Sequence, residues 1–76
     1  MSKLPVVSAK EFEKLLLKLG FQIARQKGSH RFYKHADGRY TTLTHHPVEN
    51  ISRLLIRAIL RQIELEAEEY IRLAKN

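Results

Sequence analysis

The sequence of 76 residues contains no cysteine, has few acidic residues before position 63, and lacks long apolar runs. Without cysteine, neither a disulfide framework nor a thiolate metal site can hold the fold together. The longest uninterrupted apolar runs, at 15–17 and 54–56, are far too short to cross a membrane. The N-terminal stretch also lacks the features of a secretion signal. We therefore expect a soluble, cytoplasmic protein that forms one small domain over residues 1–76.

The charge of the chain is its most informative bulk property. Fourteen Lys and Arg residues stand against eight Asp and Glu residues, which leaves a formal net charge of +6. The excess is uneven, because residues 1–62 hold twelve basic and four acidic residues, whereas residues 63–76 hold two and four. Such a balance indicates a polyanionic partner, with RNA or DNA first. The alternative is a basic surface that only aids solubility.

The N-terminal part predicts an amphipathic helix from about Ala9 to Leu19. Ser8 and Glu11 have the spacing of a capping box, in which each side chain accepts a hydrogen bond from the other residue's backbone. Apolar residues then recur at helical spacing, at Phe12, Leu15, Leu16 and Leu19. Gly20 can adopt the left-handed conformation that ends a helix.

Residues 21–46 predict a three-stranded antiparallel meander. "FQIARQK" alternates apolar and polar residues, which favours a strand with Phe21 and Ile23 facing inward. "HRFYKHA" and "RYTTLTH" are rich in aromatic residues and threonine, and Asp37-Gly38 between them is typical of a two-residue hairpin. Gly28-Ser29 makes a tighter link between the first two strands.

The C-terminal part predicts two further helices. Pro47 should end the third strand, because it lacks a backbone donor, and Asn50 can cap the next helix. The expected buried stripe of that helix is Ile51, Leu54, Leu55, Ala58 and Ile59. Residues 64–75 predict a shorter third helix with acidic first turns and an apolar side. The fold class is therefore α+β, with helices on one face of the sheet and the other face open to a ligand.

This order, with "KGSHRFYKH", "DGR" and "IRAILRQ", resembles the HicA mRNA interferase toxins over about residues 7–73. The resemblance implies a double-stranded-RNA-binding-domain-like α-β-β-β-α fold, here with an extra short C-terminal helix. It also implies the toxin of a type II toxin–antitoxin pair, which cleaves mRNA, inhibits translation and is neutralised by a HicB-like antitoxin. The family's catalytic histidine corresponds to His30, with Gly28 and Ser29 shaping the turn before it.

RNA cleavage by a neighbouring 2′-hydroxyl needs a base for that hydroxyl and cations for the charge that builds on phosphate. Histidine can give or take a proton near neutral pH. Lys27, Arg31 and Lys34 lie within a few residues of His30 and are predicted to bind phosphate, and Arg53 is predicted to contact RNA from the second helix. This arrangement requires no cofactor.

Two other questions concern the remaining histidines and the aromatic residues. The stretch "LTHHP" leaves the family's third-strand histidine ambiguous between His45 and His46, either of which is a candidate second proton-transfer group. No carboxylate or thiolate accompanies the histidines at a familiar metal-ligand spacing, so we predict no metal site. Exposed aromatic residues here can stack on unpaired bases, although alternation puts Phe32 and Tyr33 on opposite faces, so at least one belongs to the core.

Two alternative functions come from other classes of protein. A non-catalytic module that binds double-stranded RNA explains the charge and the fold equally well but gives His30 no role. A chiefly protein-binding role, with the basic face made for an acidic partner, is the third possibility.

Overall fold

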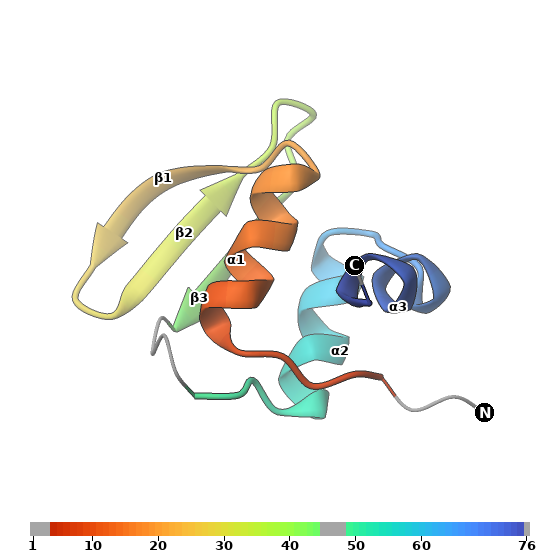
Figure 1. The fold of residues 1–76 in the computed structure, drawn as a ribbon. Helices are drawn as coiled ribbons and strands as arrows, with labels where there is room; N and C mark the ends of the chain where they lie inside the picture. The colour runs from red at the N-terminus through yellow and green to blue at the C-terminus, as the bar shows by residue number, and fades with distance from the viewer. Residues whose placement is uncertain (1–3, 45–48, 76) are drawn as a thin grey trace.

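The computed structural model describes residues 4–44 and 49–75. Its elements follow the order α-β-β-β-α-α (Figure 1). They are α1 (Ala9–Lys18), β1 (Gln22–Lys27), β2 (His30–Lys34), β3 (Tyr40–Thr44), α2 (Arg53–Gln62) and α3 (Ala67–Ala74). The three strands form one antiparallel sheet in the order β1-β2-β3. The predicted α+β class, with its double-stranded-RNA-binding-domain-like order and extra C-terminal helix, is confirmed.

Helix α1 begins and ends with the local structures that its sequence predicts. The Ser8 hydroxyl accepts a hydrogen bond from the backbone of Glu11, and the Glu11 carboxylate accepts one from the backbone of Ser8, at 3.2 and 3.0 Å. These bonds from Ser8 hold the pKa of Glu11 below its usual value. At the other end, Gly20 has φ +100° and Phe21 donates its backbone N–H to the carbonyl of Leu16. This is the Schellman arrangement, which satisfies a free carbonyl of the last turn.

The two hairpins of the sheet differ in length. Gly28 and Ser29 form a two-residue link with Gly28 at φ +61°, and Lys27 pairs with His30 across it. The second hairpin was predicted to have a two-residue turn, and this is wrong. The backbone N–H of His35 bonds to the carbonyl of Arg39, and residues 36–38 form a three-residue loop that closes with a glycine at positive φ. Such a loop is the next commonest hairpin connection after the two-residue turn.

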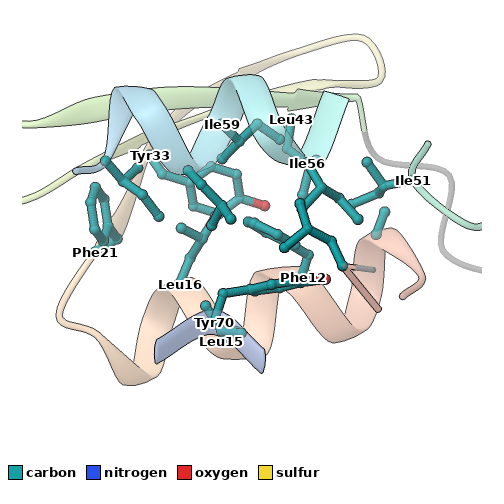
Figure 2. Packing of buried hydrophobic residues seen from close by; sticks show 14 residues of the cluster. Phe12, Leu15, Leu16, Phe21, Tyr33, Leu43, Ile51, Ile56, Ile59 and Tyr70 are labelled. Atoms are coloured by element: carbon teal, nitrogen blue, oxygen red, sulfur yellow. The ribbon is translucent and has the colours of Figure 1, made fainter. Parts of the chain in front are cut away.

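The core lies between the sheet and the helices (Figure 2). Phe12 and Leu16 of α1 pack in the same buried cluster as Tyr33 of β2 and Tyr70 of α3. Of the adjacent aromatic residues on β2, Tyr33 is therefore the one in the core. Phe21 is buried as predicted. Ile23 shares the inward face of its strand partner Tyr33, as predicted, but at the edge of the sheet it stays 46% exposed. All six residues of β1 are exposed, because this edge strand extends past the helices (Figure 1).

Helix α2 buries a different face from the predicted one. Its N-cap is Ser52, whose hydroxyl accepts the backbone N–H of Leu55, so the prediction of Asn50 is wrong. The residues buried on and just after the helix are Ile56, Ile59, Leu60 and Ile63. Three members of the predicted stripe, Leu54, Leu55 and Ala58, are exposed. Ile51 explains the error, because it is buried before the helix, in extended chain whose N–H bonds to the carbonyl of Val7.

The C-terminal helix is shorter than predicted, since α3 starts at Ala67 rather than near residue 64. Tyr70 of this helix is fully buried, and its hydroxyl donates to the carbonyl of Pro5 at 2.6 Å. Burial, followed by the charge of Glu11, raises the pKa of Tyr70 to about 12. Pro47, His45 and His46 lie outside the described residues. No helix in the described ranges is long and apolar enough to span a membrane.

Candidate functional site

His30 is the first residue of β2 and lies at the end of the hairpin that Gly28 and Ser29 turn. It pairs with Lys27 on one side and Thr44 on the other, and its side chain is exposed. A Cβ atom added at Gly28 would meet nothing within 4 Å, so this glycine serves the backbone turn rather than close packing. The sheet therefore presents His30 on its surface, next to a lysine.

The strand register shows which side chains share the face of His30. Residues directly opposite each other on paired strands project to the same face, and residues two apart on one strand do so as well. The outward rows pair residues Lys27-His30-Thr44, Arg25-Phe32-Thr42 and Gln22-Lys34-Tyr40. Tyr33, Thr41 and Leu43 project to the opposite face and are buried. We call the outward set the open face.

The open face is basic. Arg25, Lys27 and Lys34 lie on it, whereas none of the nine residues in its three rows is acidic. Lys27 and Lys34 were predicted to bind RNA, and the structure brings both to the face of His30. A face with cations and no carboxylate is suited to phosphate groups.

Arg31 lies on the other face of the sheet. Its Nη1 donates to the Glu13 carboxylate of α1 at 2.6 Å, and its Nε donates to the Gln26 side chain at 3.0 Å. The hydrogen bond to Glu13 is the main cause that raises the pKa of Arg31. The Tyr33 hydroxyl donates to the same Glu13 oxygen at 2.7 Å, and burial together with that bond raises the pKa of Tyr33. These contacts fix β2 against α1.

His35 lies at the opposite end of β2 from His30. Its Nδ1 is 3.1 Å from the backbone nitrogen of Asp37, and its Nε2 is 3.2 Å from the carbonyl oxygen of Leu19. A carbonyl oxygen only accepts, so Nε2 carries a proton and donates to Leu19, while Nδ1 also lies 3.1 Å from Oδ1 of Asp37. The ring also meets Phe21 edge-on, with centroids 5.0 Å apart. His35 therefore joins the second hairpin to the end of α1.

The remaining predicted residues are not gathered on the open face. The Nε of Arg53 donates to the carbonyl of Leu4 at 2.9 Å, at the start of α2. His45 and His46 lie outside the described residues, although His45 directly follows Thr44, the strand partner of His30. In the two described segments, no three His, Cys, Asp or Glu side chains come together as metal ligands.

The contact between Arg25 and Phe32 was not predicted from the sequence. The Cζ atom of Arg25 lies 5.1 Å from the centre of the Phe32 ring. Counting back from the two-residue turn at Gly28 and Ser29 would have placed these residues opposite each other, because a tight turn fixes the register of its strands.

Together, the α-β-β-β-α order and the exposed basic sheet define a double-stranded-RNA-binding-domain-like α+β protein with an added helix. A family model for the HicA toxin of bacterial toxin–antitoxin systems matches residues 9–65. The match covers the three strands and most of the helical structure, and the chain belongs to the HicA toxin family. Membership implies a cognate antitoxin as partner. No curated protein matches the chain.

Proposed function

We propose that this HicA-family protein is a metal-independent endoribonuclease that cleaves mRNA and inhibits translation, with His30 as its catalytic residue. The observation that carries the proposal is the exposed imidazole of His30 beside Lys27 on a face without acidic strand residues. Membership of a toxin family supports the biological setting, in which a HicB-like antitoxin blocks the activity. The site would act in the cytoplasm, where mRNA is found.

In the proposed reaction, the neutral imidazole of His30 takes the proton from a ribose 2′-hydroxyl. The 2′-oxygen attacks the adjacent phosphorus, the bond from phosphorus to the 5′-oxygen breaks, and that oxygen receives a proton. The ammonium groups of Lys27 and Lys34 lie on the same face and would offset the negative charge that develops on the phosphate. A second histidine, His45 or His46, is the candidate donor of the proton to the leaving oxygen.

The turn and the two arginines receive separate roles in this proposal. Gly28 and Ser29 hold the turn that presents His30. Arg31 and Arg53 already donate to protein oxygens, so we assign them to positioning the hairpin and the start of α2 rather than to binding RNA.

The test compares cleavage of mixed RNA by the wild type and by His30→Ala, in the presence of a chelator. We expect fragments from the wild type, intact RNA with His30→Ala, and fragments from Lys10→Ala, which changes an exposed lysine on α1. Circular dichroism must show that each variant is folded. Cleavage by folded His30→Ala at the wild-type rate would exclude the catalytic assignment. Intact but retarded RNA with the wild type would instead indicate a non-catalytic RNA-binding module.

The same variants test the biological role. Expression of the wild type should arrest growth and translation, co-expression of the cognate antitoxin should restore both, and His30→Ala should be harmless without it. Growth arrest by folded His30→Ala would show that toxicity arises elsewhere on the protein.

A further inference from the structure

We propose that Arg25 and Phe32 form a stacking site for an unpaired base of single-stranded RNA. The inference rests on the proposed function in taking RNA as the ligand, and it goes beyond it in naming the form of RNA and two binding residues. Neither residue is needed for the chemistry assigned to His30.

Arg25 and Phe32 are arranged as a surface on which a base can stack. Arg25 and Phe32 are direct cross-strand partners, and the guanidinium lies over the ring at 5.1 Å from its centre. Phe32 is partly exposed and Arg25 is exposed, on the open face rather than toward the helices. Aromatic rings and arginine planes are the groups on which proteins stack the bases of single-stranded RNA. The pair offers both kinds of surface, with the guanidinium of Arg25 stacked over the ring of Phe32.

The position of Phe32 is difficult to explain by packing alone. The hydrophobic cluster of the protein lies on the other side of the sheet, where Tyr33 takes part in it with no exposure. The direct partners of Phe32 on its own face are Arg25 and Thr42, which are both polar. An aromatic side chain among polar neighbours on an exposed sheet is typical of a surface that binds a ligand with flat apolar faces.

The charges around the pair supply the second requirement, which is a path for the phosphate backbone. Lys27 lies two residues along β1 from Arg25, and Lys34 lies two residues along β2 from Phe32. A step of two strand residues spans about 7 Å, so the stack, the two lysines and His30 are neighbours on the open face. A strand whose base stacks on Phe32 can thus reach His30 with an adjacent phosphate.

Single-stranded RNA fits this surface better than duplex RNA. In a duplex the faces of the bases are already stacked on one another, and proteins contact mainly phosphates and 2′-hydroxyls. Lysines alone would serve that purpose. The stacked Arg25 and Phe32 add a surface that only an unpaired base can use, so the pair favours a single strand.

The experiment measures affinity in the His30→Ala background, where cleavage cannot interfere, with fluorescently labelled oligo(A) and with its duplex with oligo(U). We expect oligo(A) to bind more tightly than the duplex. Phe32→Leu should weaken oligo(A) binding by about tenfold or more, and duplex binding by much less. Arg25→Lys keeps the charge but loses the plane, so it should weaken oligo(A) binding with an unchanged salt dependence. Lys27→Gln should instead lower the salt slope by about 0.7.

Matched controls separate the pair from general effects of charge or apolar area. Lys10→Gln changes an exposed lysine of α1, and Leu54→Ala changes an apolar side chain with an exposed fraction of 82% on α2. Both should leave affinity for oligo(A) unchanged. Unchanged affinity in folded Phe32→Leu and in Arg25→Lys, or tighter binding of the duplex, overturns the inference. If the wild type did not cleave RNA at all, by contrast, this would overturn the proposed nuclease activity and not the stacking site.

Discussion

Glu13→Ala tests whether the contacts behind the sheet hold β2, and with it His30, in place. The Glu13 Oε1 atom accepts hydrogen bonds from Arg31 at 2.6 Å and from the hydroxyl of Tyr33 at 2.7 Å. Tyr33 is fully buried and the Glu13 side chain is only 15% exposed, so water can replace the lost carboxylate only in part. The side chain of Arg31 is 23% exposed and can recover hydration in part.

The expected loss of stability in Glu13→Ala follows from these two hydrogen bonds. A hydrogen bond to a charged group contributes about 1.5–3 kcal/mol, and the bond from Tyr33 should give most of that value. The bond from Arg31 adds less, because it is partly solvated. We therefore expect Glu13→Ala to lower the free energy of unfolding by about 2–3 kcal/mol. The total free energy of unfolding of a domain of this size is roughly 4–11 kcal/mol. The melting temperature should fall by about 10–20 °C.

The assay is urea unfolding of the wild type, Glu13→Ala, Tyr33→Phe and the double variant. If Glu13 and Tyr33 act through one hydrogen bond, the losses of unfolding free energy in the two single variants should add up to more than the loss in the double variant. The difference should be about 1 kcal/mol or more. Lys14→Ala, which changes the next and exposed residue, is the control and should change stability by less than about 0.5 kcal/mol. Additive effects, or a loss below about 0.5 kcal/mol in Glu13→Ala, would refute the role of this contact.

Three further predictions concern the ends of α1 and α2 and the response to alkali. Gly20→Ala should destabilise by about 1–2 kcal/mol, because Gly20 has φ +100° and the new Cβ would lie 2.9 Å from Nε2 of His35. Glu64 has φ +55° just after α2, a conformation that glycine adopts without strain, so Glu64→Gly should raise the free energy of unfolding by up to about 1 kcal/mol in the same assay. Equal effects of Gly20→Ala and Glu64→Gly would contradict this account. Because the pKa of Tyr70 is raised in the folded protein, its neutral hydroxyl contributes fully to the free energy of unfolding below the unfolded pKa of about 10. That contribution is lost as the pH rises through the folded pKa of about 12. As the pH is raised, the urea midpoint of Tyr70→Phe should therefore fall less steeply than that of the wild type. Identical slopes in the two proteins would contradict a role for Tyr70 in this pH dependence.

Local signals in the sequence predicted much of the fold. The capping box at Ser8 and Glu11 and the glycine at position 20 fixed the first helix, because these bonds join residues three to five apart. The turn at Gly28 and Ser29 also placed His30 at the start of β2. Its pairing with Lys27 follows from the same turn.

Tertiary contacts decided what local signals left open. Arg31 was predicted to bind phosphate from its position beside His30, whereas its contact with Glu13 of α1, 18 residues away, could not be predicted from local sequence. The buried face of α2 differs from the predicted one because Ile51 has helical spacing to Leu54 and Leu55 in the sequence, whereas the helix begins only after Ser52. The second hairpin was misjudged because its loop includes Ala36, which carries no turn signal of its own.

The irregularity in β1 has a consequence for how the protein behaves beside other copies of itself. In the described part of the chain, β1 pairs only with β2, so one side of its backbone is available as a template for another strand. The register shift between Ile23 and Arg25 interrupts the regular spacing of that edge, and like charges at Arg25 and Lys27 would repel an identical strand. The edge can therefore stay exposed for an anionic ligand while resisting sheet growth between copies.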